Sequence, residues 1–207
     1  MAKKSYGLTG GLDSKNWIQV KLDDGSKTVS IAKYTRVKNL SHANGRESFT
    51  IIDWPYAGKK ASVKEISSNK SRFTWLTYES GGVITFDKSK KQLKFGGSKA
   101  VKTYTDPDNE IKKGTYKIWV PDYPHPLGDK YIVDSVFATI WFRLGDESSS
   151  RYLHVGNVSA GCVSVGTDGT AGSQAKGVHQ RAKYTEIAKY LLLRRKNDKH
   201  CGILKVI

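Results

Sequence analysis

The sequence predicts a mostly β fold with few helices, on three observations. Short segments such as Trp17-Ile-Gln-Val-Lys-Leu22 alternate apolar and polar side chains, which is the pattern of half-buried strands. Turns such as Asp23-Asp24-Gly25 separate these segments. One stretch, residues 183–196, repeats apolar residues at helical spacing instead. With 207 residues and 38% hydrophobic composition, the chain is globular and long enough for one large domain, or one medium and one small domain.

Residues 1–80 are predicted to form a small β-rich N-terminal region whose role the sequence does not give. Its strand candidates are residues 17–22, 28–31, 48–54 and 72–78. Five aromatic residues of this region could line a sugar-binding face: Trp17, Trp54, Tyr56, Trp75 and Tyr78. A role in a core and a domain interface is the better interpretation, because aromatic side chains dominate protein cores.

Residues 81–207 continue the β pattern and then end in a helix and a strand. The predicted strands are residues 83–86, 92–95, 99–103, 115–120, 132–144 and 151–155. In the predicted helix, one face carries Tyr184, Ile187, Ala188 and Leu191. Basic residues 194–196 stand at its C-terminal end, where the helix dipole favours positive charge. A final strand is predicted over residues 203–207. The longest apolar run, residues 131–142, is too short to cross a bilayer, so no membrane span is expected.

The segment from His154 to Cys162 carries the chemistry. A thiol becomes a strong nucleophile as the thiolate, and a neighbouring imidazole is the usual base that generates one. His154 is therefore the candidate base and Cys162 the candidate nucleophile, either by proton transfer or as a thiolate–imidazolium pair. Gly161 adds little bulk, so main-chain N–H groups beside it are able to face an oxyanion. The competing interpretation is an inert structural cysteine, because most cysteines fill space.

The order Ser159-Ala-Gly-Cys162-Val resembles the signature of the L,D-transpeptidase catalytic domain, which remodels bacterial peptidoglycan. Weaker similarities lie in residues 84–95, which resemble the opening hairpin of that family, in residues 113–118 and in residues 124–128. Two departures are present. Ser164 stands where the family usually has an arginine, and the spacing from His154 to Cys162 is shorter than is typical.

The resemblance implies a β-sandwich or barrel catalytic domain over residues 81–207 with one C-terminal helix. It implies a cysteine enzyme that attacks the L-to-D bond of a tetrapeptide stem through a Cys162 thioester. The acyl group then passes to another stem (transpeptidase) or to water (carboxypeptidase). The catalytic candidates are Cys162, His154 and Gly161, and the substrate-binding candidates are Ser159, His125, Ser164, Arg151 and Tyr131. Arg143 or Arg151 would replace the missing arginine.

The formal net charge of +16 points to anionic partners. Lysine outnumbers arginine, whereas nucleic-acid recognition favours arginine, and no basic arm is present, so we expect no nucleic-acid partner. An anionic cell wall would attract the same basic surface. The alternative function is a basic wall- or nucleic-acid-binding module whose Cys–His loop is not catalytic. No zinc-type spacing occurs, and neither a metal nor a cofactor is expected. Pairing of Cys162 with Cys201 cannot be deduced from sequence.

Location and biological role are expectations of the same kind. The first residues lack an apolar signal region, so we expect action in the periplasm or cell wall after signal removal or signal-independent secretion. In the second case the chain would be an antibacterial effector, and an immunity protein would be a further partner.

Overall fold

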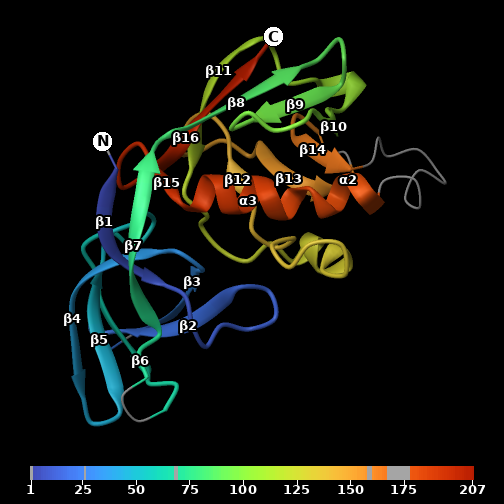
Figure 1. Cartoon of the computed structure of the whole chain (residues 1–207). Helices are drawn as coiled ribbons and strands as arrows, with labels where there is room; N and C mark the ends of the chain where they lie inside the picture. Colours follow the sequence, from blue (N-terminus) through green and yellow to red (C-terminus); the bar gives the residue numbers. More distant parts are fainter. Residues whose placement is uncertain (1, 26, 68–69, 158–159, 167–177) are drawn as a thin grey trace.

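The structure is a computed structural model that describes residues 2–25, 27–67, 70–157, 160–166 and 178–207. Within these residues the chain forms two eight-stranded sheets, and the predicted mostly β fold class is confirmed. Figure 1 shows the first sheet at the lower left and the second at the upper right, with the helix α3 (Tyr184–Leu192) beside the second sheet. None of the described helices is long and apolar enough to cross a membrane.

The first sheet has the strand order β15-β7-β1-β4-β5-β6-β2-β3. Its strands are β1 (Lys3–Leu8), β2 (Trp17–Leu22), β3 (Thr28–Ala32), β4 (Arg36–Ala43), β5 (Arg46–Ile51), β6 (Lys60–Lys64), β7 (Phe73–Ser80) and β15 (Arg194–Arg195). It curls around an apolar cluster that includes Leu8, Val20, Phe49 and Phe73. The strand β1 was not predicted, because its sequence lacks alternation of apolar residues.

The second sheet has the strand order β11-β16-β8-β9-β10-β14-β13-β12. Its strands are β8 (Gly82–Asp87), β9 (Gln92–Phe95), β10 (Val101–Tyr104), β11 (Gly114–Trp119), β12 (Phe142–Arg143), β13 (Tyr152–Gly156), β14 (Val163–Gly166) and β16 (His200–Val206). The short helices are η1 (Pro107–Asn109), η2 (Pro126–Tyr131) and α2 (Val178–Ala182), the last just before α3. The predicted strands near 83–86, 92–95 and 115–120 are confirmed.

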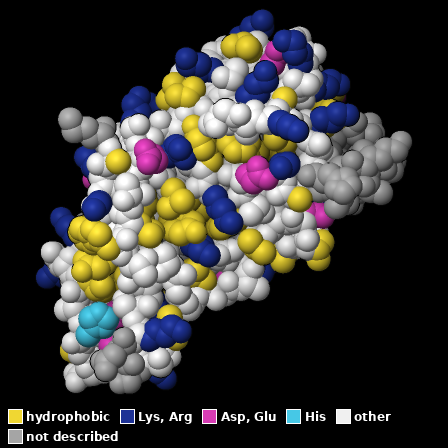
Figure 2. Space-filling view, viewed as in Figure 1, with side chains coloured by type: hydrophobic (Ala, Val, Ile, Leu, Met, Phe, Trp, Pro, Cys, Tyr) yellow, Lys and Arg dark blue, Asp and Glu magenta, His cyan; other side chains and the backbone are white. Residues whose placement is uncertain are grey.

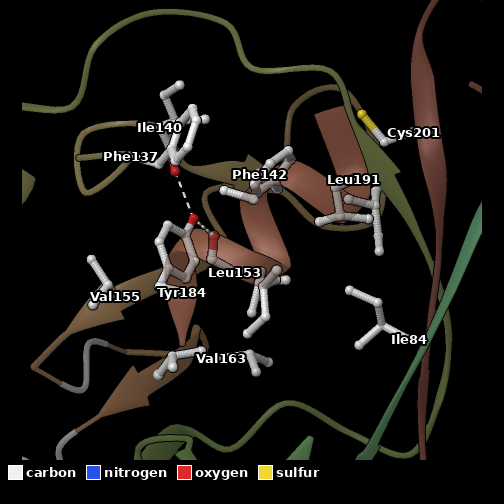
Figure 3. Close-up of a cluster of buried hydrophobic side chains, with 14 of the residues drawn as sticks. Ile84, Phe137, Ile140, Phe142, Leu153, Val155, Val163, Tyr184, Leu191 and Cys201 are labelled. Atoms are coloured by element: carbon white, nitrogen blue, oxygen red, sulfur yellow. Dashed lines mark hydrogen bonds between the residues drawn. The ribbon is translucent and has the colours of Figure 1, made fainter. Parts of the chain in front are cut away.

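The larger core lies between the second sheet and α3. Tyr184, Ile187, Ala188 and Leu191 are completely buried there, which confirms the predicted apolar face of the helix. Figure 3 shows Tyr184 among Phe137, Leu153, Val155 and Val163. The helix ends earlier than predicted, because Arg194 and Arg195 leave it to form β15; the Arg195 guanidinium still donates to the Leu192 carbonyl at the helix end.

The C-terminal segment joins the two sheets, since β15 pairs with β7 and β16 pairs with β8. At this junction the completely buried carboxylate of Asp53 binds both Arg36 and Arg195 at 2.7 Å. Burial raises the pKa of Asp53, but the two guanidinium groups outweigh this and hold it below its usual value. The ion cluster therefore ties the first sheet to the segment after α3.

The predicted strand over residues 132–144 is wrong for most of its length. After η2, tight turns bond Ser135 N–H to Tyr131 O and Ile140 N–H to Phe137 O, and strand pairing resumes only at Phe142. A continuous apolar run fits a buried strand and a buried series of turns equally well, so hydrophobicity does not separate them.

The aromatic residues of the N-terminal region divide between core and surface. Trp17 and Tyr78 are buried, as the core interpretation expects, whereas Trp75 is 58% exposed and packs edge-to-face against Tyr6 at 4.7 Å. Figure 2 shows Lys and Arg side chains scattered over both sheets on the visible face, without a single basic stripe.

Candidate active site

The candidate catalytic residues lie on two neighbouring parallel strands. In the pairing of β13 with β14, Leu153 lies opposite Val163 and His154 opposite Ser164. Because side chains alternate along a strand, Leu153 and Val163 face the core shown in Figure 3, and His154 and Ser164 share the other face. Cys162, two residues before Ser164, belongs to that face at the start of β14. The fold thus brings His154 and Cys162 to diagonal positions on adjacent strands.

The imidazole of His154 has a defined proton. Its Nδ1 lies 3.0 Å from the main-chain oxygen of Val155, which accepts but cannot donate, so Nδ1 carries the hydrogen. Its Nε2 lies 3.0 Å from Ser164 Oγ, and this hydroxyl also lies 3.2 Å from the main-chain oxygen of Asn157. Burial lowers the pKa of His154 to about 4. The resting imidazole is therefore neutral at pH 7, with Nε2 as its unprotonated nitrogen.

The thiol of Cys162 is buried at 3% exposure, in contact with Trp141 and Tyr152. Its Sγ accepts a hydrogen bond from the main-chain N–H of Tyr152 at 3.3 Å. The indole of Trp141 stacks on His154 with ring centres 4.3 Å apart, and so covers both candidate catalytic residues. A substrate carbonyl reaches Sγ only after neighbouring side chains move.

A small pocket borders His154 on its solvent side. It has a volume of about 140 Å³, and its lining is Leu127, Lys130, Tyr131, Trp141, His154, Val155 and Asn157. The Tyr131 hydroxyl accepts from the Asn157 N–H at 3.0 Å, and its ring packs on Gly156 so closely that a Cβ there would lie 2.0 Å from it. Tyr131 is thus a wall of the pocket, and its contact with substrate stays a prediction.

Gly161 has a φ of +71°, a conformation that favours glycine. The side chain of Arg151 lies over this residue, and a Cβ on Gly161 would sit 2.9 Å from Arg151 Nε. Among the described residues, no hydrogen bond or ion pair engages the Arg151 guanidinium. The Arg151 guanidinium therefore lies beside Gly161, the residue that precedes Cys162.

Arg143, the other arginine considered, is already occupied. It binds Asp122 at 2.7 Å and donates to the Ser149 carbonyl. Asp122 also binds His125 at 3.1 Å. Burial raises the pKa of Asp122, but hydrogen bonds from His125 and Arg143 outweigh burial and lower it.

His125 is enclosed by aromatic rings. Its ring stacks on Tyr123 at 4.2 Å and on Trp141 at 4.5 Å, so it lies behind Trp141 as seen from His154. His125 is 5% exposed, which leaves little of it for substrate. Ser164 is completely buried against His154, and Ser159 lies outside the described residues. Substrate binding by these three residues stays a prediction.

Sequence reasoning missed Asp122, Tyr152 and Asn157, which act through a hydrogen bond or a main-chain atom and leave no pattern in the sequence.

Cys201 is a free, completely buried thiol, and burial raises its pKa to about 11. Over the described part of the chain, no group of three His, Cys, Asp or Glu side chains is placed to hold a metal ion.

Comparisons with solved structures give a distant similarity of fold. The fold is similar to the crystal structure of Mycobacterium tuberculosis L,D-transpeptidase 1, with a TM-score of 0.36 and 10% identity, over 91% of this chain and 85% of that chain. No protein-family model matches the sequence, and no curated protein matches it.

Proposed function

We propose that this chain is a cysteine enzyme of the cell wall that cleaves or transfers at the L-to-D bond of peptidoglycan tetrapeptide stems. The observation that carries the proposal is the placement of His154 and Cys162 on one face of paired strands, with the His154 proton held on Nδ1 by Val155. That tautomer leaves Nε2 as the base, which is the arrangement that thiol activation needs.

The proposed reaction begins with neutral His154. Its lowered pKa favours proton transfer during attack over a preformed thiolate–imidazolium pair. The Cys162 S–H bond breaks, the proton passes to Nε2, and sulfur attacks the carbonyl carbon. Main-chain N–H groups at Gly161 and Cys162 face the oxyanion. The C–N bond then breaks, and Nε2 returns its proton to the departing D-amino acid.

The thioester is resolved by an amine or by water. A second stem's amine gives a cross-link, and water gives a shortened stem, so the same intermediate serves transpeptidase and carboxypeptidase activity. Arg151, beside Gly161, is the cation proposed to bind the substrate carboxylate, because a guanidinium pairs with carboxylates in two hydrogen bonds. Action in the periplasm or wall, delivery as an antibacterial effector and an immunity partner belong to this proposal.

Purified protein incubated with tetrapeptide muropeptides and followed by mass spectrometry tests the function. We expect loss of a terminal D-alanine or formation of 3→3 dimers, abolished by Cys162→Ala and retained by Cys201→Ala, the matched removal of the other free thiol. Product formation by Cys162→Ala at the wild-type rate would exclude Cys162 as the nucleophile.

A binding module with a non-catalytic loop is the second candidate, favoured by the 3% exposure of Cys162 and its contacts with Trp141 and Tyr152. Alkylation separates the two. A catalytic Cys162 reacts quickly with iodoacetamide below the reference thiol pKa of about 8.5, and His154→Ala slows it. An inert thiol together with tight, salt-sensitive DNA binding would favour the module.

A further inference from the structure

The Ser164 hydroxyl has one hydrogen and two acceptors within reach. Nε2 of His154 lies 3.0 Å from Oγ, and the main-chain oxygen of Asn157 lies 3.2 Å from it. Ser164 is completely buried in the middle of β14, opposite His154 in the strand register. The hydroxyl can donate to only one of these two partners at a time.

The direction of this hydrogen is coupled to the protonation of His154. Because Nδ1 donates to Val155, a neutral imidazole presents a lone pair at Nε2, to which the Ser164 O–H can donate. When Nε2 is protonated, its N–H needs an acceptor. Ser164 Oγ becomes that acceptor once its own hydrogen turns to Asn157 O. Each arrangement satisfies the buried groups Nδ1, Nε2 and Oγ.

We propose that Ser164 is a two-position hydrogen-bond switch, which donates to Nε2 of neutral His154 and turns to the Asn157 carbonyl when His154 takes up a proton. Its use in catalysis rests on the proposed function; the switch itself rests on the hydrogen bonds alone. Ser164 is thus a positioning residue, which acts through His154 and does not bind substrate.

The proton balance is simple. In the thiol-activation step, the S–H bond of Cys162 breaks and an N–H bond forms at Nε2. Ser164 keeps its own hydrogen and changes only the direction of that bond, from Nε2 to Asn157 O. When the leaving amine takes the proton from Nε2, the hydroxyl turns back.

The charged and titratable groups around His154 are those that the test must hold constant. Cys162 and Tyr152 share its face of the sheet, and His125 lies beyond Trp141 and further lowers the pKa of His154. From η2, Lys130 and Tyr131 line the pocket beside it. None of these side chains accepts a hydrogen bond from both His154 Nε2 and Ser164 Oγ. A substitution at Ser164 alone therefore leaves these neighbouring groups unchanged.

The experiment measures His154 directly in the full-length protein, without substrate. Long-range ¹H–¹⁵N NMR gives the tautomer and the Nε2 shift at pH 7, and deuterium exchange at ring C2 gives the protonation constant. We expect the wild type to carry its proton on Nδ1. Ser164→Val should change the Nε2 shift, because the hydrogen bond with Ser164 is lost, and lower the protonation constant about tenfold, because the hydrogen bond to the charged ring is the stronger one.

Ser164→Thr is the matched variant, since it has nearly the same volume as valine but keeps a hydroxyl, and it should restore both values. Ser135→Ala, which removes another buried hydroxyl away from His154, should leave them unchanged. A wild-type proton on Nε2, or identical values in the Val and Thr variants, would overturn the switch. Intact NMR behaviour in a protein without muropeptide activity would instead contradict the proposed function and leave the switch standing. Labelling of Ser164 by a fluorophosphonate would show a nucleophile and so refute a positioning role.

Discussion

The Tyr184 hydroxyl, on α3, lies 3.2 Å from the main-chain oxygen of Leu153, the residue next to His154 on β13. The same hydroxyl lies 2.6 Å from the Ile140 oxygen, beside Trp141 (Figure 3). Burial raises the pKa of Tyr184 well above its usual value, so the phenol stays protonated and able to donate. Tyr184 therefore holds two segments together: the strand β13, which carries the candidate base His154, and the segment that carries Trp141, whose indole covers His154.

Tyr184→Phe should destabilise the fold by about 1–3 kcal/mol, because it leaves buried carbonyl oxygens without a donor. Urea unfolding measures this loss. Tyr190→Phe is the control on the same helix, since its hydroxyl meets main-chain atoms of Val83 at an exposed site, and it should cost under about 1 kcal/mol. Equal costs for the two variants would contradict a special role for the buried phenol.

Asp53→Asn should destabilise the chain by about 3–5 kcal/mol, because it leaves the buried guanidinium groups of Arg36 and Arg195 without their carboxylate. The comparison variant is Asp198→Asn, which removes a 62% exposed partner of Arg36 and should cost less than about 1 kcal/mol. Chemical denaturation checks both, and a small effect of Asp53→Asn would mean that the ion cluster does not hold the sheets together.

Acid should weaken the fold through His154. The unfolded chain protonates this histidine near pH 6.5, and the folded chain only near pH 4. Between these values the unfolded state binds more protons, so stability that is present above pH 6.5 is lost as the pH falls toward 4, by roughly 3 kcal/mol at most.

Urea unfolding at pH 7 and pH 4.5 measures this decline, and His154→Gln should reduce it. His200→Gln provides the comparison, since burial and neighbouring lysines also lower the pKa of that buried histidine. An unchanged pH dependence in His154→Gln would argue against a buried neutral imidazole.

Arg151→Gln should lower kcat/KM about tenfold or more for stems with a free terminal carboxylate, mainly through KM, because a charge-assisted hydrogen bond is lost. Arg151→Lys should retain part of the activity. Arg143→Gln should instead lower the melting temperature, since Arg143 binds Asp122. Steady-state kinetics with thermal melting separates the two arginines, and a larger KM effect at Arg143 would reverse their proposed roles.

The strands and α3 could be predicted because their periodicity is local: Ile84 and Phe86 alternate with polar neighbours, and Tyr184 to Leu191 follow the helical period. Residues 132–141 could not, because an apolar run does not show whether its main chain bonds to a neighbouring strand or turns on itself. The strand β1 could not either, because its pairing with β4 and β7 depends on residues more than 25 positions away.

For the site, the sequence predicted which residue types could react but not their partners. His154 and Cys162 were identifiable from chemistry, and their shared face follows from a parallel pairing that no local pattern reveals. The hydrogen bond of Ser164 to His154 and the engagement of Arg143 by Asp122 depend on side chains brought together by the fold. The position of Ser164 in the sequence suggested substrate contact, which stays a prediction, and gave no sign that its hydroxyl lies 3.0 Å from His154 Nε2.

Because residues 194–206 supply one strand to each sheet, neither sheet is complete without this segment. A nascent chain that has released residues 1–190 from the ribosome still lacks the edge strand of the first sheet and the strand between β11 and β8 in the second. Removal of residues 194–206 would leave both sheets one strand short, whereas removal of β16 alone would interrupt only the second sheet.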